Sequence, residues 1–211
     1  RRVLAAMGAQ LVLTPADSGM TGAVQKAQEL LLETPGHFFM PNQFSNPANP
    51  LIHERTTGPE IWSQTDGQVA AVVAGVGTGG TIAGVGRSFK NIGASVQMVA
   101  VEPAESPLLT QRSSGQPLAP ASHGIQGIGA NFIPQVVDFS LIDRIVPVGS
   151  HEAIDTARRL ACEEGILCGI SSGAAVVAAL RLAAEAAYAG KLIVAILPDS
   201  GERYLSTALF A

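Results

Sequence analysis

The sequence predicts an α/β fold, a mostly parallel twisted sheet with helices on both faces. Three observations support this prediction. Segments typical of strands alternate along the chain with segments typical of helices. The run "QVAAVVAGV" (68–76) contains mostly small and β-branched residues, as in a strand buried on both faces of a parallel sheet. The 211 residues are 47% hydrophobic and only 14% charged, which indicates a large aliphatic core.

The first third of the chain is expected to be mainly helical. Residues 1–7 resemble the end of a helix, closed by Gly8 and followed by a strand at Ala9–Leu13. Between 19 and 36, Val24, Ala27 and Leu30 share one face, which predicts an amphipathic helix. A short strand is expected within 37–44. Residues 46–67 are expected to form a helical segment that ends at the turn residues Asp66-Gly67.

The remaining two thirds alternate more regularly. After the buried strand at 68–76, strands are predicted at 96–103, 143–149 and 191–198. Helices are predicted at about 81–90, 106–114, 151–165 and 171–190. Ser150 should cap the third of these helices and Gly165 should end it. The helix at 171–190 is apolar nearly all round and should therefore be buried.

The start of the chain suggests how its domains are organised. It opens in what reads as the middle of a helix, with no initiator Met and no N-cap, so we expect that an N-terminal part is missing. Residues 1–46 are predicted to be the remainder of a truncated N-terminal α/β domain. Residues 47–211 are predicted to be a larger C-terminal α/β domain that binds a cofactor phosphate.

Composition excludes several kinds of partner. The formal net charge of −4 provides no basic field for nucleic acid or an anionic membrane. No apolar stretch approaches the ~20 residues that span a bilayer. Cys162 and Cys168 fit neither a metal knuckle nor a C-x-x-C redox pair, so two buried thiols and a cytoplasmic, reducing location are expected.

Three unusual loops should meet at one edge of the sheet, where α/β folds bind ligands. They are "GVGTGGT" (75–81), "CGISSGA" (168–174) and "LPDSGERYLST" (197–207). The first loop matches G-x-G-x-x-G, with Glu102 ending the next strand as a candidate ribose ligand, so an NAD-dependent oxidoreductase is one hypothesis. The hydroxyls of Thr78 and Thr81 favour a compact nest for one terminal phosphate at a helix N-terminus. A glycine turn with only a packing role is the third alternative.

The second loop places Ser171 and Ser172 before a helix that carries no charge until Arg181. Either serine could cap that helix. Beside a phosphate nest, a neutral hydroxyl could instead face a heteroaromatic ring nitrogen. An acid at that position would hold the nitrogen protonated, and a serine would not.

These motifs resemble the cysteine synthases, which are pyridoxal-phosphate-dependent O-acetylserine sulfhydrylases. The resemblance rests on "GVGTGGTIAGVGR", "HGIQGIGANFIP", "GISSGAAV" and "SGERYLST", with "NQFSNPANP" and "TTGPEIW" upstream. It covers essentially the whole chain and implies the tryptophan synthase β-like fold (fold type II) with pyridoxal 5′-phosphate as cofactor. The implied activity is that of a transferase of cysteine biosynthesis, which replaces the acetate of O-acetyl-L-serine by sulfide.

The resemblance also implies roles for single residues. The residues that would bind the cofactor phosphate are Gly77, Thr78, Gly79, Gly80 and Thr81. Ser171 would meet the pyridine nitrogen. Gln43 would lie near the substrate carboxylate, and the backbone of Gly127 would face the active-site entrance.

The family's Schiff-base lysine has no counterpart at a matching position. Lys26 is expected on a helix face, Lys90 at a helix end and Lys191 at a strand start. We therefore predict that this chain has no catalytic lysine and is inactive by itself. The four histidines show no metal-ligand spacing, and structural or hydrogen-bonding roles are expected for His37, His53, His123 and His151.

Other functions remain open at this stage. They are a cystathionine β-synthase-like enzyme, the NAD-dependent oxidoreductase and a non-catalytic binding fragment. "NQFSNPANP" together with "GISSGAAV" favours the sulfhydrylase. The resemblance further implies a homodimer with serine acetyltransferase as a partner.

Overall fold

The computed structural model describes all 211 residues and divides them into two compact units, Arg1–Pro41 and Asn42–Ala211. The boundary expected from the sequence, between residues 46 and 47, lies a few residues further along. The smaller unit is helical. Its elements are α1 (Arg2–Ala6), a 3-10 helix (Ala16–Ser18) and α2 (Gly19–Glu33).

Two strands predicted in the first 46 residues are wrong. Residues 9–13 and 37–44 contain no strand, and the hydrophobic side chains of Leu11, Val12 and Leu13 are exposed. A strand requires a neighbouring strand to pair with its backbone groups. No segment of this chain pairs with residues 9–13, so their apolar pattern alone does not produce β structure.

The larger unit is built on a four-stranded parallel sheet with the order β3-β2-β1-β4. The strands are β1 (Val69–Gly75), β2 (Gln97–Pro103), β3 (Arg144–Val148) and β4 (Leu192–Ala195). Val73 is in register with Val99 of β2 and with Ala195 of β4. The predicted fold class is therefore confirmed, and β1 lies in the middle of the sheet.

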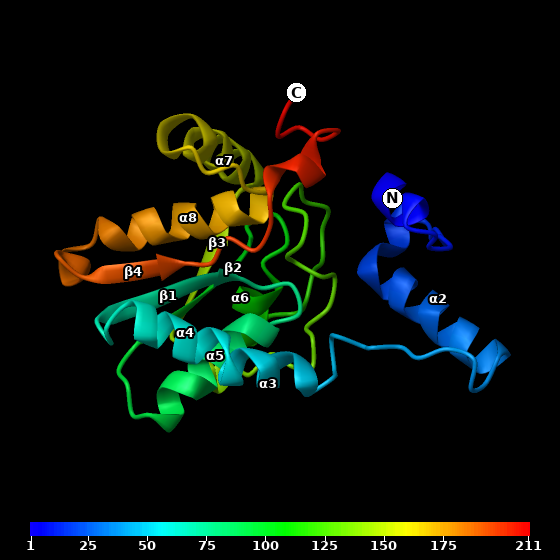
Figure 1. The fold of residues 1–211 in the computed structure, drawn as a ribbon, viewed down its shortest axis with the longest axis horizontal. Coiled ribbons are helices and arrows are strands. Elements are labelled where there is room, and N and C mark those ends of the chain that lie inside the picture. Colours follow the sequence, from blue (N-terminus) through cyan, green and yellow to red (C-terminus); the bar gives the residue numbers. More distant parts are fainter. The chain divides into compact units, whose positions relative to one another are not determined.

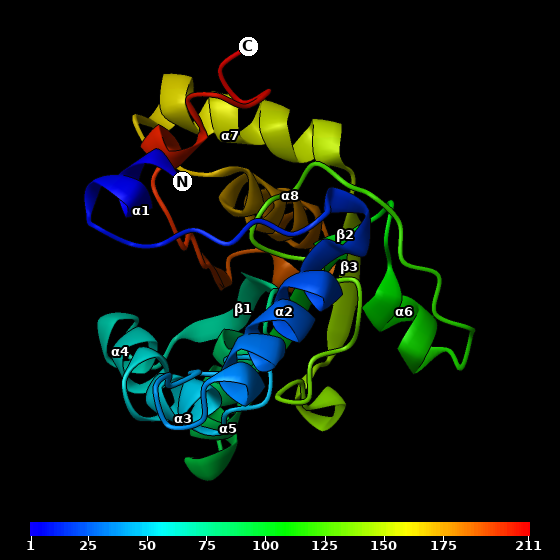
Figure 2. The same cartoon turned by 90° about the vertical axis from the view of Figure 1, so that its right-hand side faces the viewer.

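Helices cover both faces of this sheet. They are α3 (Ala48–Arg55), α4 (Thr57–Gln64), α5 (Gly80–Asn91), α6 (Leu108–Ser113), α7 (Ser150–Glu164) and α8 (Ile170–Ala183). Short 3-10 helices lie at Phe139–Leu141, Ala186–Tyr188 and Gly201–Tyr204. Helices α3, α4 and α5 lie on one face, and α8, with α7 stacked against it, lies on the other (Figure 1). Figure 2 shows the same layers from the side, with the sheet between the two groups of helices.

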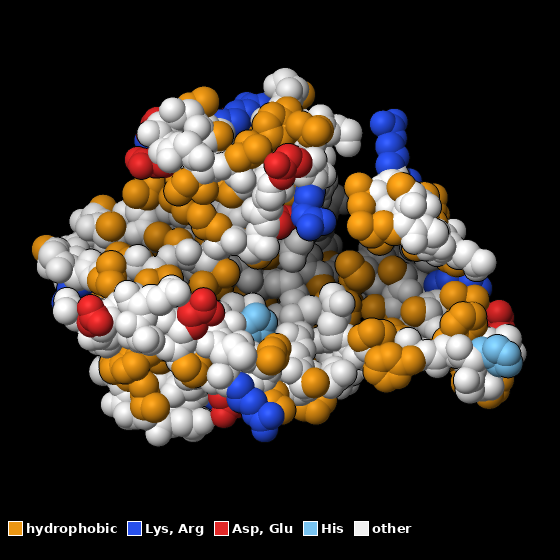
Figure 3. Space-filling view, viewed as in Figure 1, with side chains coloured by type: hydrophobic (Ala, Val, Ile, Leu, Met, Phe, Trp, Pro, Cys, Tyr) orange, Lys and Arg blue, Asp and Glu red, His pale blue; other side chains and the backbone are white.

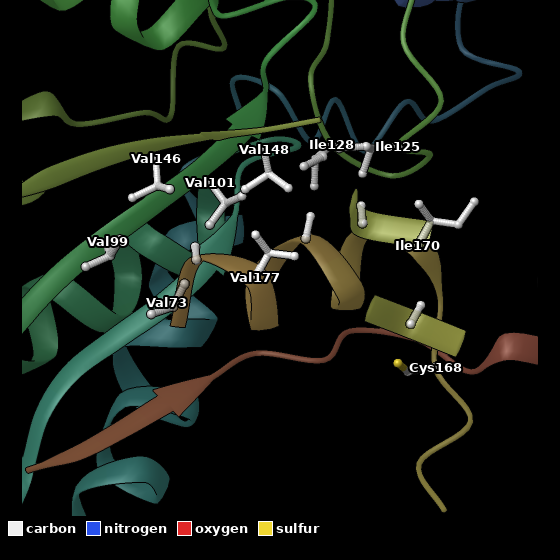
Figure 4. Packing of buried hydrophobic residues seen from close by; sticks show 14 of the residues in the cluster. Val73, Val99, Val101, Ile125, Ile128, Val146, Val148, Cys168, Ile170 and Val177 are labelled. Atoms are coloured by element: carbon white, nitrogen blue, oxygen red, sulfur yellow. The ribbon is translucent and has the colours of Figure 1, made fainter. Parts of the chain in front are cut away.

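The core has two layers because the sheet is buried on both faces. Val73, Val99 and Val101 point from the strands toward α8, where they meet Val177 (Figure 4). On the opposite face, side chains of β1 and β2 pack with those of α5: Val72, Ala74, Met98 and Ala100 with Ile82, Val85 and Phe89. This double burial explains why the sequence of β1 shows no alternation of polar and apolar residues.

Glycines bring α3 and α4 unusually close to α5. A Cβ on Gly84 would stand 2.2 Å from the Pro50 carbonyl oxygen, and one on Gly58 would overlap Ser88. The segment 46–67, expected as one helical stretch, is two helices because Thr56 leaves the helical region at φ −124°, ψ −69°. The Thr56 hydroxyl donates to the carbonyl of Ile52 (2.7 Å) at the end of α3.

Two predicted helix boundaries are partly wrong. Helix α7 ends at Gly165 in the left-handed conformation (φ +70°), as expected, but its N-cap is Gly149. Ser150 is instead the first residue of α7, and its Oγ accepts a hydrogen bond from the amide of Gly124 (2.7 Å). The long helix expected to reach residue 190 ends at Ala183, and a 3-10 turn follows it.

The surface of the larger unit is rich in hydrophobic side chains. On the face shown in Figure 3 they gather over α8 and β4, where Leu180 is 52% and Leu192 is 44% exposed. None of the helices combines the length and the apolar character that crossing a bilayer requires. The expectation of two buried thiols holds for Cys168 but not for Cys162, which is exposed on the outer side of α7.

Candidate cofactor site

A cavity of about 460 Å³ lies at the carboxyl ends of β1 and β4 in the larger unit. All three loops singled out in the sequence contribute to its wall, together with the loop around Gly127. The lining residues are Ala74, Gly75, Gly77, Thr78, Gly79, Thr81, Gly127, Ile128, Ser171, Ile196, Pro198, Asp199 and Arg203. The expected meeting of these loops at one edge of the sheet is confirmed.

The turn between β1 and α5 has the donor set of an anion site. The amide groups of Gly77, Thr78 and Gly79 make no hydrogen bond within the chain. They stand directly before the N-terminus of α5, whose dipole favours negative charge. Gly79 is the N-cap of α5 in the left-handed conformation (φ +85°), which turns the chain from the strand into the helix. These features together fit a phosphate group.

Close packing shapes this turn. A Cβ on Gly77 would stand 2.5 Å from the carbonyl oxygen of Gly127, so two loops far apart in sequence touch here. A Cβ on Gly79 would meet the side chain of Val137. Gly77 and Gly79 are therefore required by close packing in the fold. Gly80 does not line the cavity and begins α5.

The hydroxyls of Thr78 and Thr81 contact side chains of α3. Thr78 Oγ1 accepts hydrogen bonds from Asn49 Nδ2 (2.9 Å) and from the amide of Gly80 (3.2 Å). Thr81 Oγ1 lies 3.3 Å from His53 Nε2. Burial lowers the pKa of the His53 imidazole, so it is neutral at pH 7.

Ser171 also lines the cavity, from the first turn of α8. It is 3% exposed, and its hydroxyl makes no hydrogen bond within the chain. Its Oγ stands 3.6 Å from the position that a Cβ on Gly127 would take. The interpretation of Ser171 as a helix cap is wrong, because the N-cap of α8 is Gly169. The unpaired hydroxyl fits the acceptor nitrogen of an aromatic ring.

The sequence analysis missed two charged residues of the cavity wall. Asp199 follows β4; its Oδ2 accepts a hydrogen bond from the Tyr204 hydroxyl, and its Oδ1 is buried without a partner. Burial and the Asp199 charge raise the pKa of Tyr204, which therefore remains a donor. Arg203 provides a cation beside them. The loop "LPDSGERYLST" was recognised as unusual, but its pattern did not say which side chains face the cavity.

Other predicted residues lie away from the cavity wall. The Gln43 side chain is exposed, while its carbonyl oxygen accepts a hydrogen bond from Asn49 Nδ2 (2.8 Å). Lys90 lies in the last turn of α5, at the end opposite the phosphate turn, and Lys191 precedes β4 at the amino edge of the sheet. Lys26 lies on α2 of the smaller unit and forms an ion pair with Glu29 (3.0 Å).

Glu102 does not act as a ribose ligand. It is 2% exposed, and its carboxylate accepts hydrogen bonds from the amides of Leu109 (2.7 Å) and Thr110 (3.0 Å) and from the Thr110 hydroxyl. These amides belong to the first turn of α6, so Glu102 satisfies donors that this helix leaves unpaired. The match to a dinucleotide motif thus fails at its acidic residue.

We expect Glu102→Gln to destabilise the protein by about 1–3 kcal/mol at pH 7, because the new amide group would leave a buried backbone donor unpaired. Burial raises the pKa of Glu102, so the folded state binds this proton more tightly than the unfolded chain. Its contribution to stability therefore falls as the pH rises through its folded pKa. Urea unfolding between pH 5 and pH 8 should show the gap between wild type and variant widening toward acid pH. A gap that narrows instead would contradict this assignment.

The chain is similar to known pyridoxal-phosphate-dependent enzymes along nearly its whole length. A family model described as pyridoxal-phosphate dependent enzyme matches residues 1–199. The chain is 56% identical to cysteine synthase A of Escherichia coli (strain K12) over 213 residues, which cover 100% of this chain and 66% of that protein. It is 56% identical to a cysteine synthase of Haemophilus influenzae, of which it covers 67%. A crystal structure of cysteine synthase (OASS) from Entamoeba histolytica aligns with a TM-score of 0.90 at 44% identity, over 99% of this chain and 60% of that one.

The fold and the site thus have the features of an α/β enzyme domain with a phosphate-binding turn. The chain belongs to the family of pyridoxal-phosphate-dependent enzymes. It spans about two thirds of the length of the curated cysteine synthases that it matches.

Proposed function

We propose that this chain carries the phosphate-binding and ring-nitrogen-binding parts of a cysteine synthase, an enzyme that makes L-cysteine from O-acetyl-L-serine and sulfide. The observation that supports this most directly is the cavity at the carboxyl edge of the sheet. The phosphate turn, Gly127 and Ser171 all line this cavity. The similarity to cysteine synthases along the whole chain supports the substrate class.

Different residues of the cavity would bind the phosphate and the ring of pyridoxal phosphate. The amides of Gly77, Thr78 and Gly79, with the hydroxyls of Thr78 and Thr81, would bind the phosphate. The Ser171 hydroxyl would donate a hydrogen bond to the ring nitrogen. Because the serine keeps its proton, that nitrogen would stay neutral. When bound, the cofactor supplies an electron sink. A neutral ring is a weaker sink, which suits the loss of a leaving group that carries charge away.

The phosphate assignment predicts that Thr78→Ala/Thr81→Ala weakens binding of pyridoxal phosphate to the chain by about a hundredfold or more, since each of the two charge-assisted hydrogen bonds contributes about 1.5–3 kcal/mol. Backbone donors remain, so some binding should persist. Equilibrium dialysis should show the loss for pyridoxal phosphate and little change for pyridoxal, which lacks the phosphate.

A suitable control is Thr65→Ala, because Thr65 bonds only to carbonyl groups of α4 and does not line the cavity. Equal affinity of the double variant and wild type for pyridoxal phosphate would contradict the proposed phosphate site. Failure of the wild-type chain to distinguish pyridoxal phosphate from pyridoxal would contradict it as well.

The role of Ser171 predicts a change in the protonation of the bound ring. Ser171→Asp should place a carboxylate at the nitrogen and raise its pKa, so that the ring becomes protonated near neutral pH. The ¹⁵N NMR shift of labelled pyridoxal phosphate bound to the chain reports this directly, and Ser171→Ala serves as the uncharged control. An unchanged shift in the Asp variant would show that Ser171 does not face the nitrogen.

The structure disfavours an NAD-dependent oxidoreductase, because Glu102 is occupied by α6. A dialysis test with NADH should therefore show no binding. Gln43 near the substrate carboxylate and Gly127 at the entrance remain part of the proposal. The homodimer and the serine acetyltransferase partner remain predictions from the family resemblance, and the cytoplasmic location remains a prediction from the cysteine pattern. The exposed Leu180 and Leu192 support a protein partner.

A further inference from the structure

Helix α3 provides a second layer behind the phosphate turn. Asn49 and His53 stand one helical turn apart on α3, so they share a face, and Thr57 follows at the start of α4. This face packs against the N-terminal half of α5, where Gly80 and Gly84 leave room for it. Asn49 comes from the segment "NQFSNPANP" (42–50), whereas His53 and Thr57 follow that segment.

The orientation of the Asn49 amide is set by the backbone. Asn49 Nδ2 lies 2.8 Å from the carbonyl oxygen of Gln43, a group that can only accept a hydrogen bond. The nitrogen rather than the oxygen of the amide must therefore point this way. Its second hydrogen is directed to Thr78 Oγ1 at 2.9 Å. A Cβ on Gly80 would overlap Asn49 Oδ1, so the glycine admits the amide.

The hydrogen bonds of Thr78 leave its hydroxyl with one direction to donate. A threonine hydroxyl has one proton and two acceptor lone pairs. Both lone pairs of Thr78 Oγ1 are engaged, one by Asn49 and one by the amide of Gly80. Its proton remains available, and Thr78 lines the cavity. Asn49 thus makes this hydroxyl a donor before any ligand arrives.

His53 stands in the same relation to Thr81. Its Nδ1 lies 2.8 Å from the Thr57 hydroxyl, and its Nε2 lies 3.3 Å from Thr81 Oγ1. In the tautomer that carries its proton on Nε2, the neutral imidazole accepts from the Thr57 hydroxyl at Nδ1 and donates to Thr81 from Nε2. The proton of Thr81 is then also free to point into the cavity that Thr81 lines.

We infer that Asn49 and His53 are positioning residues that orient the hydroxyls of Thr78 and Thr81 as donors to the phosphate of the bound cofactor. This inference rests on the proposed function, since it concerns the same phosphate. It assigns a task to α3 that goes beyond packing. Neither residue lines the cavity, so each would act only through the threonine that it contacts.

A double-mutant cycle tests the inference on the full 211-residue chain. Asn49→Ala is expected to weaken binding of pyridoxal phosphate about tenfold and binding of pyridoxal less than twofold. In a Thr78→Val background, which has no hydroxyl to orient, Asn49→Ala should have less than a twofold further effect. The same cycle with His53→Leu and Thr81→Val should show the same coupling. His53→Gln, whose amide can still donate toward Thr81, should recover part of the affinity.

Two matched controls separate orientation from general damage. Asn91→Ala removes a similar amide hydrogen bond, to Glu54, at the far end of α5. His151→Leu removes an exposed histidine from α7. Both should bind pyridoxal phosphate like wild type. Equal losses for pyridoxal phosphate and pyridoxal, or equal effects of Asn49→Ala in the wild-type and Thr78→Val backgrounds, would overturn the inference.

The two proposals can fail separately. If Thr78→Val weakens pyridoxal phosphate binding while Asn49→Ala in a folded protein leaves it unchanged, the phosphate site stands and the positioning role is wrong. If the wild-type chain binds pyridoxal phosphate no better than pyridoxal, the phosphate site fails and the positioning role fails with it. Should Asn49→Ala not fold, the His53 cycle decides the inference alone.

Discussion

Replacing Gly84 with alanine is expected to lower the free energy of unfolding by about 2–3 kcal/mol, the cost of forcing extra volume into a packed contact. The added Cβ would stand 2.2 Å from the carbonyl oxygen of Pro50 and 2.6 Å from His53 Cβ. These atoms belong to α3 and cannot swing aside as a flexible side chain can. The gain of about 1 kcal/mol in helix propensity from Gly to Ala is too small to offset this overlap.

Thermal unfolding should show the effect as a fall in Tm of roughly 5–10 °C for a chain of this size. Gly86→Ala is the matched control, because Gly86 lies two residues further along α5. The nearest atom to its added Cβ would be Leu141 Cβ, at 3.2 Å. An equal Tm for Gly84→Ala and wild type would show that α3 and α5 are not in close contact. The added Cβ would also push His53 away from its place, because it would lie 2.6 Å from His53 Cβ. The variant should therefore bind pyridoxal phosphate less well than wild type.

The second prediction with a large effect concerns covalent attachment of the cofactor. When pyridoxal phosphate is added to the 211-residue chain and the mixture is reduced with borohydride, no lysine should be labelled stoichiometrically. Lys90 and Lys191 lie at the ends of their elements remote from the phosphate turn, and Lys26 is held by Glu29 on α2. Bound cofactor should therefore leave on dialysis, and turnover of O-acetylserine with sulfide should be absent.

Intact-mass spectrometry followed by peptide mapping provides the measurement. Wild type and Thr78→Ala/Thr81→Ala should show the same low background of labelling, because exposed lysines react without a site. Stoichiometric labelling of one lysine that disappears in the double variant would place that lysine at the cavity and overturn the prediction. Turnover in the same sample would show that the chain is catalytically complete.

Most elements of the larger unit were predictable because their cause is local. The run 68–76 has the composition of a strand buried on both faces and forms β1 at the centre of the sheet. Gly165 ends α7 in the left-handed conformation that glycine tolerates best. The apolar residues before and after "GVGTGGT" indicated a strand and a helix, and the glycines indicated the turn between them.

Three of the wrong predictions have a different cause, because each depended on a contact that the local residue pattern does not identify. Residues 9–13 have the pattern of a strand, but nothing in this chain pairs with them. Ser150 stands where a capping residue is expected, yet its hydroxyl is taken by the amide of Gly124. Glu102 stands at the distance of a ribose ligand, and its carboxylate caps α6 instead.

For this protein the sequence alone determined the α/β class, the order of the elements and the loops that carry the cofactor site, because residue spacing and turn chemistry act over a few positions. Only the tertiary structure decided which side chains face the cavity. Asp199 and Arg203 line the cavity, the carbonyl of Gln43 accepts a hydrogen bond from the Asn49 amide, and Asn49 and His53 contact the two threonines from α3. Hydrogen bonds and close contacts between segments far apart in the chain depend on packing geometry, and no local pattern of residues records that geometry.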